Sequence, residues 1–249
     1  MNLSVTQKIY SDKQIAMSEK ILVIIPTYNE IKNIEDIIKE TFKYLPQTHV
    51  LVVDDNSPDG TYEKASDLSA SNKQIHLIKR QAKLGLRSAY QEGFRYALKE
   101  NFDYIIQMDA DFSHHPRYLP SLVNAAKNAD LVLGSRYVAG AEVRGWSLFR
   151  KCLSRGGSFY AGLILNMPYF DLTGGFKCFR QNTLRVIDFE SLKSNGYAFQ
   201  IETTWRAHRN LPRVVETPII FENRVKGKSK MSSAILMEAI WRVWQFKLT

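Results

Sequence analysis

The 249-residue sequence predicts an α/β fold in which a mostly parallel sheet is flanked by helices. Short, continuous apolar runs rich in β-branched residues alternate with stretches whose apolar residues recur at helical spacing. Polar residues follow the ends of several of these runs. Strands that are joined by helices run parallel and are covered on both faces, which explains why the runs are apolar throughout. The five runs cover residues 21–26, 49–55, 75–80, 104–109 and 131–136.

The first two strands and their helices are clear in the sequence. The run "ILVIIP" (21–26) predicts a strand that is buried on both faces. The segment 33–45 spaces its isoleucine, phenylalanine and leucine side chains at helical intervals. A second strand, "HVLVVDD" (49–55), is followed by the turn cluster "NSPDGT" (56–61), and a helix then begins at Tyr62.

The same alternation continues to residue 136. Strands are expected at 75–80, 104–109 and 131–136, with helices at 85–100 and 116–128. Proline opens the second of these helices, a position where its missing N–H costs nothing. This order of elements predicts successive βαβ units.

From about residue 139 the regular alternation fades. A glycine pair and then a strand-like alternation are expected at 171–180, a strand at 214–224 and a flexible basic loop at 225–232. Helices are expected at 148–167, 197–209 and 233–248. Here the sequence predicts individual elements but not their order in a sheet.

Composition excludes several classes of protein. The chain is 45% hydrophobic and 24% charged, which is typical of a globular domain with a sizeable core. Its only cysteines, Cys152 and Cys178, have no close pairing pattern and are expected to be free thiols in a reducing compartment. The N-terminal twenty residues have no apolar signal-peptide core, and no run of eighteen apolar residues occurs. We therefore expect a cytoplasmic protein without a transmembrane helix.

The net charge of +9 points to anionic partners. No run of five or more Lys and Arg residues and no nucleic-acid-binding signature is present, so nucleic acid is not an expected partner. Two interpretations stay open at this point: a solvated basic surface, or positive charge that gathers around phosphate groups.

An acidic pair follows the fourth strand in the stretch "MDADFSHHP" (108–116). On an extended backbone Asp109 and Asp111 would point the same way and repel each other unless a cation lies beside them. Mg²⁺ and Mn²⁺ favour oxygen ligands and keep bound phosphates in their coordination shell. The pair therefore predicts a metal clamp for a nucleotide diphosphate, and the alternative is a surface turn with two solvated aspartates.

Other polar residues follow neighbouring strands. Tyr28 and Glu30 come after the first strand, Asp55 ends the second, and Arg136 ends the fifth. In open α/β sheets ligands bind at the carboxyl ends of the strands, so these side chains should converge. Asp55 is expected to hydrogen-bond a ribose or a base edge, with a turn or cap acid as the alternative.

Taken together, these motifs resemble the family 2 inverting glycosyltransferases of the Rossmann-like GT-A fold. The resemblance is closest to the polyprenol-phosphate (dolichol-phosphate) mannose synthases, through "MDADFSHHP", "GWSLFRKCLSRGGSF", "DLTGGFKCFR" and "NRVKGKSK". It covers residues 20 to about 232. It implies a GT-A catalytic domain (20–232). The composition of the flanking residues predicts a polar N-terminal segment (1–19) and a C-terminal amphipathic helix (233–249).

The resemblance also implies roles for individual residues. Asp109 and Asp111 match the metal site, with Ser113 nearby, and Asp111 and Arg136 are the expected catalytic residues. The residues that match the family's positions for binding the donor nucleotide sugar are Pro26, Tyr28, Glu30, Val53, Asp55, Asp109, Ala110, Asp111, Arg136, Arg224 and Lys230. The residues that match the family's positions for binding the acceptor phosphate are Arg136, Arg150 and Ser154. Asp171 and Glu202 receive no role, and His114 and His115 are expected to cap or orient the helix that Pro116 opens.

The implied reaction moves mannose from GDP-mannose to a polyprenyl (dolichyl) phosphate with inversion, and it yields polyprenyl-phosphate β-mannose and GDP. The acceptor phosphate is already ionised at neutral pH, so positioning and charge stabilisation should suffice without a strong general base. The cofactor would be Mg²⁺ or Mn²⁺. Two alternatives are a UDP-glucose transferase that acts on a lipid phosphate, and a catalytically inactive nucleotide-binding subunit of a membrane complex.

A long isoprenoid acceptor implies work at a membrane surface. We expect a peripheral protein on the cytoplasmic face of a membrane, with or without a small membrane partner subunit. The C-terminal helix carries Trp241 and Trp244 beside Arg242 and Lys247, a mixture that suits the membrane interface. The alternative is a helix that packs against the domain or against a partner.

Overall fold

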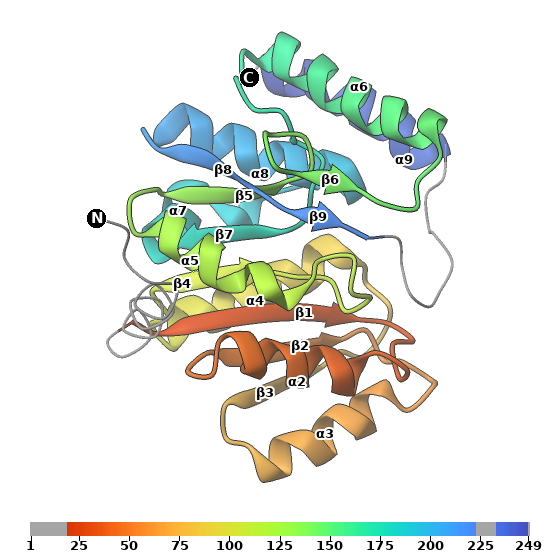
Figure 1. The fold of residues 1–249 in the computed structure, drawn as a ribbon, viewed down its shortest axis with the longest axis vertical. Coiled ribbons are helices and arrows are strands. Elements are labelled where there is room, and N and C mark those ends of the chain that lie inside the picture. The colour runs from red at the N-terminus through yellow and green to blue at the C-terminus, as the bar shows by residue number, and fades with distance from the viewer. Residues whose placement is uncertain (1–18, 223–232, 249) are drawn as a thin grey trace, which may run out of the picture.

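A single seven-stranded sheet with helices on both faces forms the centre of the molecule (Figure 1). The structure is a computed structural model that describes residues 19–222 and 233–248. The strand order is β3-β2-β1-β4-β7-β5-β8, and every pair is parallel except the two that involve β7. The predicted α/β class with a mostly parallel sheet is confirmed.

The first half of the chain folds as the sequence predicts. Four parallel strands alternate with three helices, and the apolar runs of the sequence form the buried strands. The strands are β1 (Ile21–Thr27), β2 (His49–Asp54), β3 (Ile75–Lys79) and β4 (Tyr104–Gln107). The helices are α2 (Ile34–Tyr44), α3 (Thr61–Ser71) and α4 (Leu86–Lys99). Strand β4 ends two residues before the position expected from the sequence.

The second half departs from regular alternation. Strand β7 (Lys177–Arg180) enters antiparallel between β4 and β5, and it confirms the strand-like alternation expected after the glycine pair of 171–180. A short two-stranded sheet of β6 (Glu142–Val143) and β9 (Ile220–Phe221) was not predicted, nor was helix α7 (Gln181–Val186). The other elements are η2 (Pro116–Tyr118), α5 (Leu119–Ala126), β5 (Leu131–Ser135), α6 (Leu148–Leu165), η3 (Phe189–Ser191), α8 (Gly196–Asn210), β8 (Val214–Pro218) and α9 (Ser233–Lys247).

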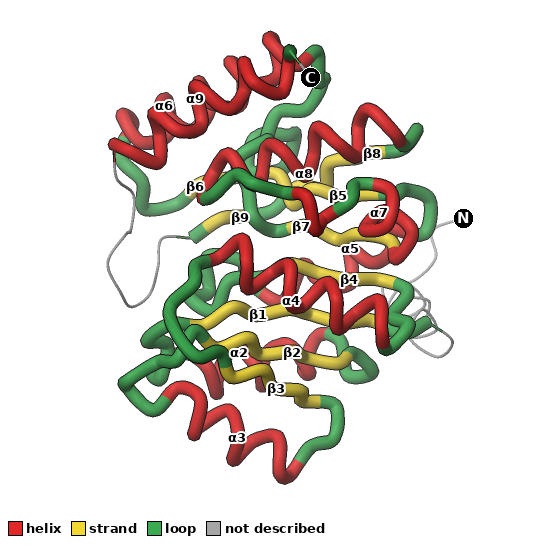
Figure 2. The backbone as a smooth tube through the Cα atoms, turned by 180° about the vertical axis from the view of Figure 1, so that it is seen from behind, coloured by secondary structure: helices red, strands yellow, loops and turns green. Residues whose placement is uncertain are grey.

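Each face of the sheet has its own hydrophobic core. Apolar side chains of α2 and α5 cover one face. Those of α4, α7 and α8 cover the other, and Figure 2 shows these three helices in front of the sheet. Strands that are buried on both sides are rigid, so they hold the loops at their carboxyl ends in fixed positions.

Helices α6 and α9 lie side by side at one end of the molecule (Figures 1 and 2). Helix α9 buries Val243 and Phe246, and the Phe246 ring stacks on Trp205 of α8 with centroids 5.4 Å apart. Its Trp241 and Trp244 are exposed. The interpretation that this helix packs against the domain is therefore confirmed, and its exposed side presents apolar side chains to solvent. None of the described helices is long and apolar enough to span a bilayer.

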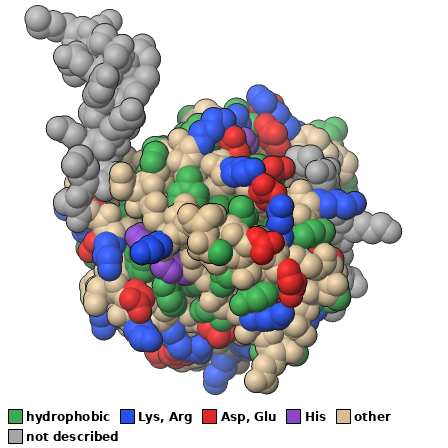
Figure 3. Space-filling view, turned by 90° about the horizontal axis from the view of Figure 1, so that it is seen from below, with side chains coloured by type: hydrophobic (Ala, Val, Ile, Leu, Met, Phe, Trp, Pro, Cys, Tyr) green, Lys and Arg blue, Asp and Glu red, His purple; other side chains and the backbone are tan. Residues whose placement is uncertain are grey.

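The opposite end of the molecule, around α3, has a different surface. Lys and Arg side chains are interspersed there with Asp and Glu (Figure 3). Ion pairs join Lys64 to Glu35 at 2.6 Å and Lys79 to Glu63 at 3.1 Å. The two ends therefore differ in polarity: one is charged with both signs, and the other exposes apolar side chains.

Lys177 is fully buried in β7, beneath α8. Its Nζ donates hydrogen bonds to the carbonyl oxygen of Gln200 at 2.6 Å and to Oγ1 of Thr203 at 2.9 Å. Burial lowers the pKa of Lys177 from 10.5 to about 7, although the nearby Asp171 offsets part of this effect. The folded protein therefore releases this proton at a lower pH than the unfolded chain does.

We expect the free energy of unfolding to rise with pH between about 7 and 9 because of Lys177. In this window the unfolded chain holds a proton that the folded protein has lost, and the contribution is at most about 1.4 kcal/mol per pH unit. The Lys177→Met variant lacks this contribution. Urea unfolding of both proteins at pH 7, 8 and 9 should show a difference in stability that shifts in favour of the wild type as pH rises. A difference that stays constant with pH would contradict the assignment.

Candidate active site

An open cleft lies at the carboxyl edge of the sheet, with an empty volume of about 1690 Å³ that includes space open to solvent. Loops after β1, β2, β4 and β5 contribute to its wall, as expected for an open α/β sheet. Nine of the sequence-predicted residues line it: Pro26, Tyr28, Glu30, Asp55, Asp109, Ala110, Asp111, Arg136 and Arg150. The convergence that the strand ends predicted is thus observed.

The acidic pair lies in a tight turn rather than on an extended strand. Phe112 adopts a left-handed backbone conformation (φ 64°), and Oδ1 of Asp111 accepts a hydrogen bond from the Ser113 N–H at 3.0 Å. The side chain of Asp109 is 34% exposed, whereas Asp111 is only 4% exposed. The expectation of an extended backbone was wrong, because β4 ends before the pair. The turn nevertheless brings both carboxylates to the same cleft.

The two histidines that follow have different roles. His115 accepts a hydrogen bond from the Arg117 N–H at 3.2 Å and caps η2, which agrees with the expectation for this residue. His114 accepts a hydrogen bond from the Asp109 N–H at its Nδ1, also at 3.2 Å, and its ring stacks on Phe176 with centroids 5.0 Å apart. His114 therefore anchors the backbone of the acidic pair rather than the helix.

The two aspartates at the end of β2 have different roles: one is buried within the fold, and the other lines the cleft. Asp54 is fully buried and accepts hydrogen bonds from Thr27 Oγ1 at 2.7 Å and from Ser57. Asp55 lines the cleft, where it pairs with Arg80 and accepts the Gly85 N–H at 2.9 Å. These contacts hold the Asp55 carboxylate in one position.

The loop after β1 forms the neighbouring wall. The Nζ of Lys83 lies 4.0 Å from the centre of the Tyr28 ring, within the range of a cation–π interaction. Oε2 of Glu30 accepts a hydrogen bond from Nδ2 of Asn33 at 2.8 Å. Tyr28 and Glu30 line the same cleft as Asp55.

Arg136 is held by Asp171 in a buried ion pair. Nε and Nη2 of Arg136 donate to the two carboxylate oxygens at 2.7 and 2.6 Å, and the Arg136 backbone N–H donates to Oδ2 at 2.9 Å. Burial alone would lower the pKa of Arg136, but Asp171 more than offsets it and the pKa rises above its usual value. Arg136 therefore stays charged and has a fixed orientation at the cleft.

Asp171 is the functional residue that sequence reasoning left without a role. Its position is set by β8, where the Glu216 carboxylate accepts the N–H groups of Phe170 at 2.8 Å and Asp171 at 2.9 Å. Its carboxylate also accepts the Gly174 N–H at 3.1 Å. The signal in the sequence was the acid that opens "DLTGGF", yet its partner lies 35 residues away.

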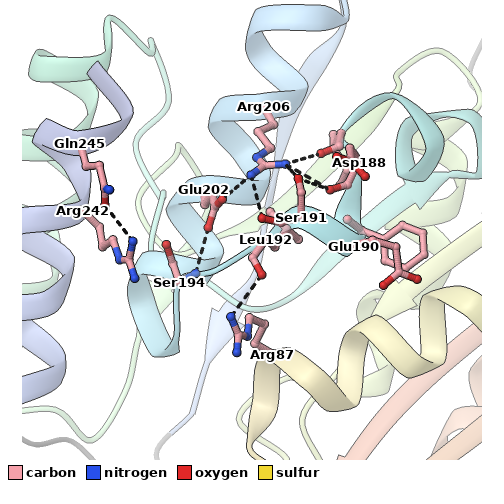
Figure 4. Close-up of polar contacts among 12 residues, drawn as sticks. Arg87, Asp188, Glu190, Ser191, Leu192, Ser194, Glu202, Arg206, Arg242 and Gln245 are labelled. Atoms are coloured by element: carbon pink, nitrogen blue, oxygen red, sulfur yellow. Dashed lines mark hydrogen bonds and ion pairs between the residues drawn. The ribbon is translucent and has the colours of Figure 1, made fainter. Parts of the chain in front are cut away.

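The start of α8 forms a further wall through Gly196, Tyr197 and Gln200. The segment before it is anchored from two sides, as Figure 4 shows. Arg206 donates to main-chain oxygens of residues 187, 188 and 191 and pairs with Glu202 at 2.7 Å, and Arg87 of α4 donates to the Leu192 carbonyl at 3.2 Å. Glu202, which had no assigned role, is therefore part of this anchor.

A second, apolar cavity adjoins the cleft. Its empty volume is about 580 Å³, which includes space open to solvent, and side chains of α6, α8 and α9 line it. Trp146, Arg150, Thr173 and Tyr197 line both spaces. The guanidinium of Arg150 lies 4.0 Å from the Trp146 ring centre. The polar cleft therefore continues into a hydrophobic compartment.

The remaining predicted residues lie elsewhere. Ser154 lines the apolar cavity rather than the polar cleft. The Val53 side chain is buried in the core and does not line the cleft. Arg224 and Lys230 lie outside the described residues.

Comparison with known proteins agrees with this architecture. The sequence model of Glycosyl transferase family 2 matches residues 22–187. The chain is 42% identical to an undecaprenyl-phosphate mannosyltransferase of Micrococcus luteus, over 92% of this chain and 94% of that protein. It is also 42% identical to a polyprenol monophosphomannose synthase of Mycolicibacterium smegmatis, over 91% of this chain and 86% of that protein.

Solved structures share the fold at lower identity. A glucosyl-3-phosphoglycerate synthase from Mycobacterium tuberculosis, in complex with Mn²⁺, UDP and phosphoglyceric acid, matches with a TM-score of 0.67 at 17% identity, over 94% of this chain and 82% of that chain. The mannosyltransferase PcManGT from Pyrobaculum calidifontis, in complex with GDP-Man and Mn²⁺, matches with a TM-score of 0.55 at 17% identity, over 89% of this chain and 64% of that chain. With the cleft, the sheet order and these relatives in agreement, the chain belongs to glycosyl transferase family 2 and has the GT-A fold.

Proposed function

We propose that this protein transfers mannose from GDP-mannose to a polyprenyl (dolichyl) phosphate with inversion. The observation that carries the proposal is a single cleft that joins an acidic pair to a fixed arginine and then opens into an apolar cavity. Such a site suits two phosphorylated reactants, one of which has a hydrocarbon tail. The two mannosyltransferase relatives at 42% identity support the choice of sugar and acceptor.

Asp109 and Asp111 are the residues that would hold a divalent cation. Both carboxylates line the cleft, and the described residues contain no group of three or more His, Cys, Asp or Glu side chains that could hold a metal ion. Two carboxylates together with substrate phosphates are a typical donor set for Mg²⁺ and also suit Mn²⁺. The bound cation would neutralise negative charge on the departing diphosphate. The Mn²⁺ complexes of two structural neighbours are consistent with this assignment.

The nucleoside would lie along β1 and β2. Asp55 has a fixed carboxylate that can accept hydrogen bonds from a base edge, and Tyr28 and Glu30 border the same wall. The Val53 backbone is the expected contribution of that residue, since its side chain is in the core. Arg224 and Lys230 are proposed to add positive charge to the diphosphate.

The acceptor phosphate would bind on the arginine side of the cleft. Arg136 and Arg150 flank Trp146, with guanidinium carbons 5.5 and 4.0 Å from its ring centre. Arginine matches phosphate oxygens in pairs and stays charged at all relevant pH values. Ser154 lies one helical turn beyond Arg150 and lines the apolar cavity, where the first isoprene units would lie.

In the proposed reaction an ionised oxygen of the polyprenyl phosphate attacks C1 of mannose. A new C1–O bond forms as the bond from C1 to the diphosphate oxygen breaks, and GDP leaves with the electron pair. No proton has to be removed from the nucleophile, so the site needs no strong general base. Catalysis would come from holding both reactants in line and from opposing the charge that develops on GDP.

The same end of the molecule is proposed to contact the membrane. On α6, the exposed residues Leu148, Phe149, Phe159 and Leu163 fall within a stripe about 100° wide. On α9 and directly after it, Ile240, Trp241, Trp244 and Leu248 form a similar stripe. Both helices line the apolar cavity, so a lipid tail would pass from the bilayer to the cleft between them. A partner subunit stays a prediction.

The purified protein should transfer labelled mannose from GDP-mannose into an organic-extractable product when dolichyl phosphate and Mn²⁺ or Mg²⁺ are present. UDP-glucose in a parallel reaction tests the other donor. The Asp111→Ala variant should lose transfer by at least about 10²-fold, because it removes a ligand for the cation that opposes charge on the leaving group. Full activity of this variant, or transfer of glucose in place of mannose, would overturn the corresponding part of the proposal.

The Asp171→Asn variant should bind the acceptor poorly, because Arg136 loses the charge that fixes its orientation. We expect kcat/KM for polyprenyl phosphate to fall by about 10²-fold, since small displacements of a positioning group have effects of this size. The dissociation constant of GDP should change little, because Asp55 and the acidic pair are unaffected. Steady-state kinetics with the acceptor varied, together with GDP titration, provide the check. An equal loss of GDP affinity would show that the ion pair acts on the whole site.

The double variant Phe159→Ser/Trp241→Ser should bind lipid vesicles more weakly than the wild type, by roughly tenfold or more, because it removes one large apolar side chain from each stripe. Val215→Ser, which changes an exposed apolar residue on β8, is the matched control and should bind as the wild type does. Co-sedimentation with vesicles is the measurement. Unchanged vesicle binding by the double variant would exclude these stripes as the membrane contact.

A further inference from the structure

We propose that His114 and Gln200, which face each other across Gly175, form the subsite that binds hydroxyl groups of the transferred sugar. The inference rests on the proposed function in that it takes the donor to be a sugar nucleotide. All three residues line the cleft, and they come from three separate parts of the chain: the turn after β4, the loop before β7 and helix α8.

His114 presents a hydrogen-bond donor to the cleft. Its Nδ1 accepts the Asp109 N–H at 3.2 Å, so this nitrogen carries no proton and the ring proton is on Nε2. The ring is almost fully buried between Phe176 and Phe221, with centroids 5.0 and 5.7 Å away, which fixes its orientation. Within the described part of the chain, Nε2 makes no hydrogen bond.

Gln200 has a buried amide oxygen that no described residue pairs with. The residue is 3% exposed, and its Oε1 is buried with no hydrogen bond among the described residues. Its main-chain oxygen, by contrast, accepts bonds from Lys177, Thr203 and Thr204. Leaving a buried amide oxygen unpaired is costly, and a rotation of the amide toward the cleft, which Gln200 lines, would let a ligand complete its hydrogen bonds.

Gly175 leaves the space between these two side chains open. A Cβ atom at this position would lie 3.3 Å from Nε2 of Gln200 and 3.4 Å from Cε1 of His114. The φ angle of Gly175 is not in the left-handed region, so the backbone conformation does not demand glycine. The constraint is space, and the space is bordered by two groups that can hydrogen-bond.

The location of this subsite in the cleft favours binding of a sugar rather than of a phosphate. His114 adjoins Asp109 on the metal side, and its neighbour Phe221 also contacts the Arg136 guanidinium at 5.4 Å. The subsite thus lies between the groups proposed to bind the donor diphosphate and those proposed to bind the acceptor phosphate. The sugar carbon C1, which passes from one phosphate to the other, must lie there. An amide and an imidazole form directional hydrogen bonds, and the amide carries no formal charge, so the two groups suit hydroxyl groups. The phosphates would instead bind the cation and the arginines.

The experiment compares binding of GDP-mannose with binding of GDP by calorimetry in the presence of Mn²⁺. The Gln200→Met variant keeps the length of the side chain and removes its hydrogen bonds. We expect its dissociation constant for GDP-mannose to rise about tenfold while that for GDP changes less than twofold, since one lost hydrogen bond typically has this effect. Gly175→Ala should act in the same selective way by filling the space.

Gln107→Met is the matched control. Gln107 is also a buried glutamine whose side-chain atoms have no partner among the described residues, but it does not line the cleft. It should leave the ratio of the two dissociation constants unchanged. Deoxy analogues of GDP-mannose then provide a direct test: removal of the hydroxyl that Gln200 binds should weaken wild-type binding and should not weaken Gln200→Met further.

Two results would overturn the inference. One is an equal loss of affinity for GDP and GDP-mannose in Gln200→Met, and the other is unchanged affinity for GDP-mannose. Failure of the proposed function gives a different pattern, in which the wild type binds and transfers glucose from UDP-glucose instead. In that case the same variants are compared on UDP-glucose and UDP, and a selective loss for the sugar nucleotide still supports the subsite.

Discussion

The buried pair of Arg136 and Asp171 is the interaction on which the arrangement of the cleft depends. It joins the carboxyl end of β5 to the loop before β7 through three hydrogen bonds, and both residues are buried. A buried ion pair adds little net stability, but removal of one partner is costly. Its contribution here is orientation, since it keeps a permanently charged guanidinium at the edge of the cleft.

The position of this pair follows from the insertion of β7. An antiparallel strand between β4 and β5 separates the strand that leads to the acidic pair from the strand that leads to Arg136. The acidic pair and Arg136 therefore follow strands that are not neighbours in the sheet, although both line one cleft. The space between them is bordered by His114, Gly175 and Gln200, which can hydrogen-bond a ligand without adding a further ionised carboxylate or guanidinium.

The apolar end of the molecule lies next to the polar cleft. Helices α6 and α9 line a hydrophobic cavity, together with α8, and they also expose apolar side chains to solvent. Arg150 belongs to α6 and lines both the cavity and the cleft, so one helix links the charged and the hydrophobic compartments. An amphiphilic acceptor needs this continuity, because its phosphate must reach the donor while its tail stays out of water.

Local patterns in the sequence determined the class of fold, the strands β1 to β5 and the residues that follow them, because apolar runs and helical spacing are short-range signals. Family motifs then indicated the acidic pair, Asp55 and Arg136. Only the tertiary structure decided that the pair lies in a turn, that β7 enters the sheet antiparallel, and that Arg136 meets Asp171. These features join residues far apart in the chain, and contacts between distant segments leave no periodic trace in a single sequence.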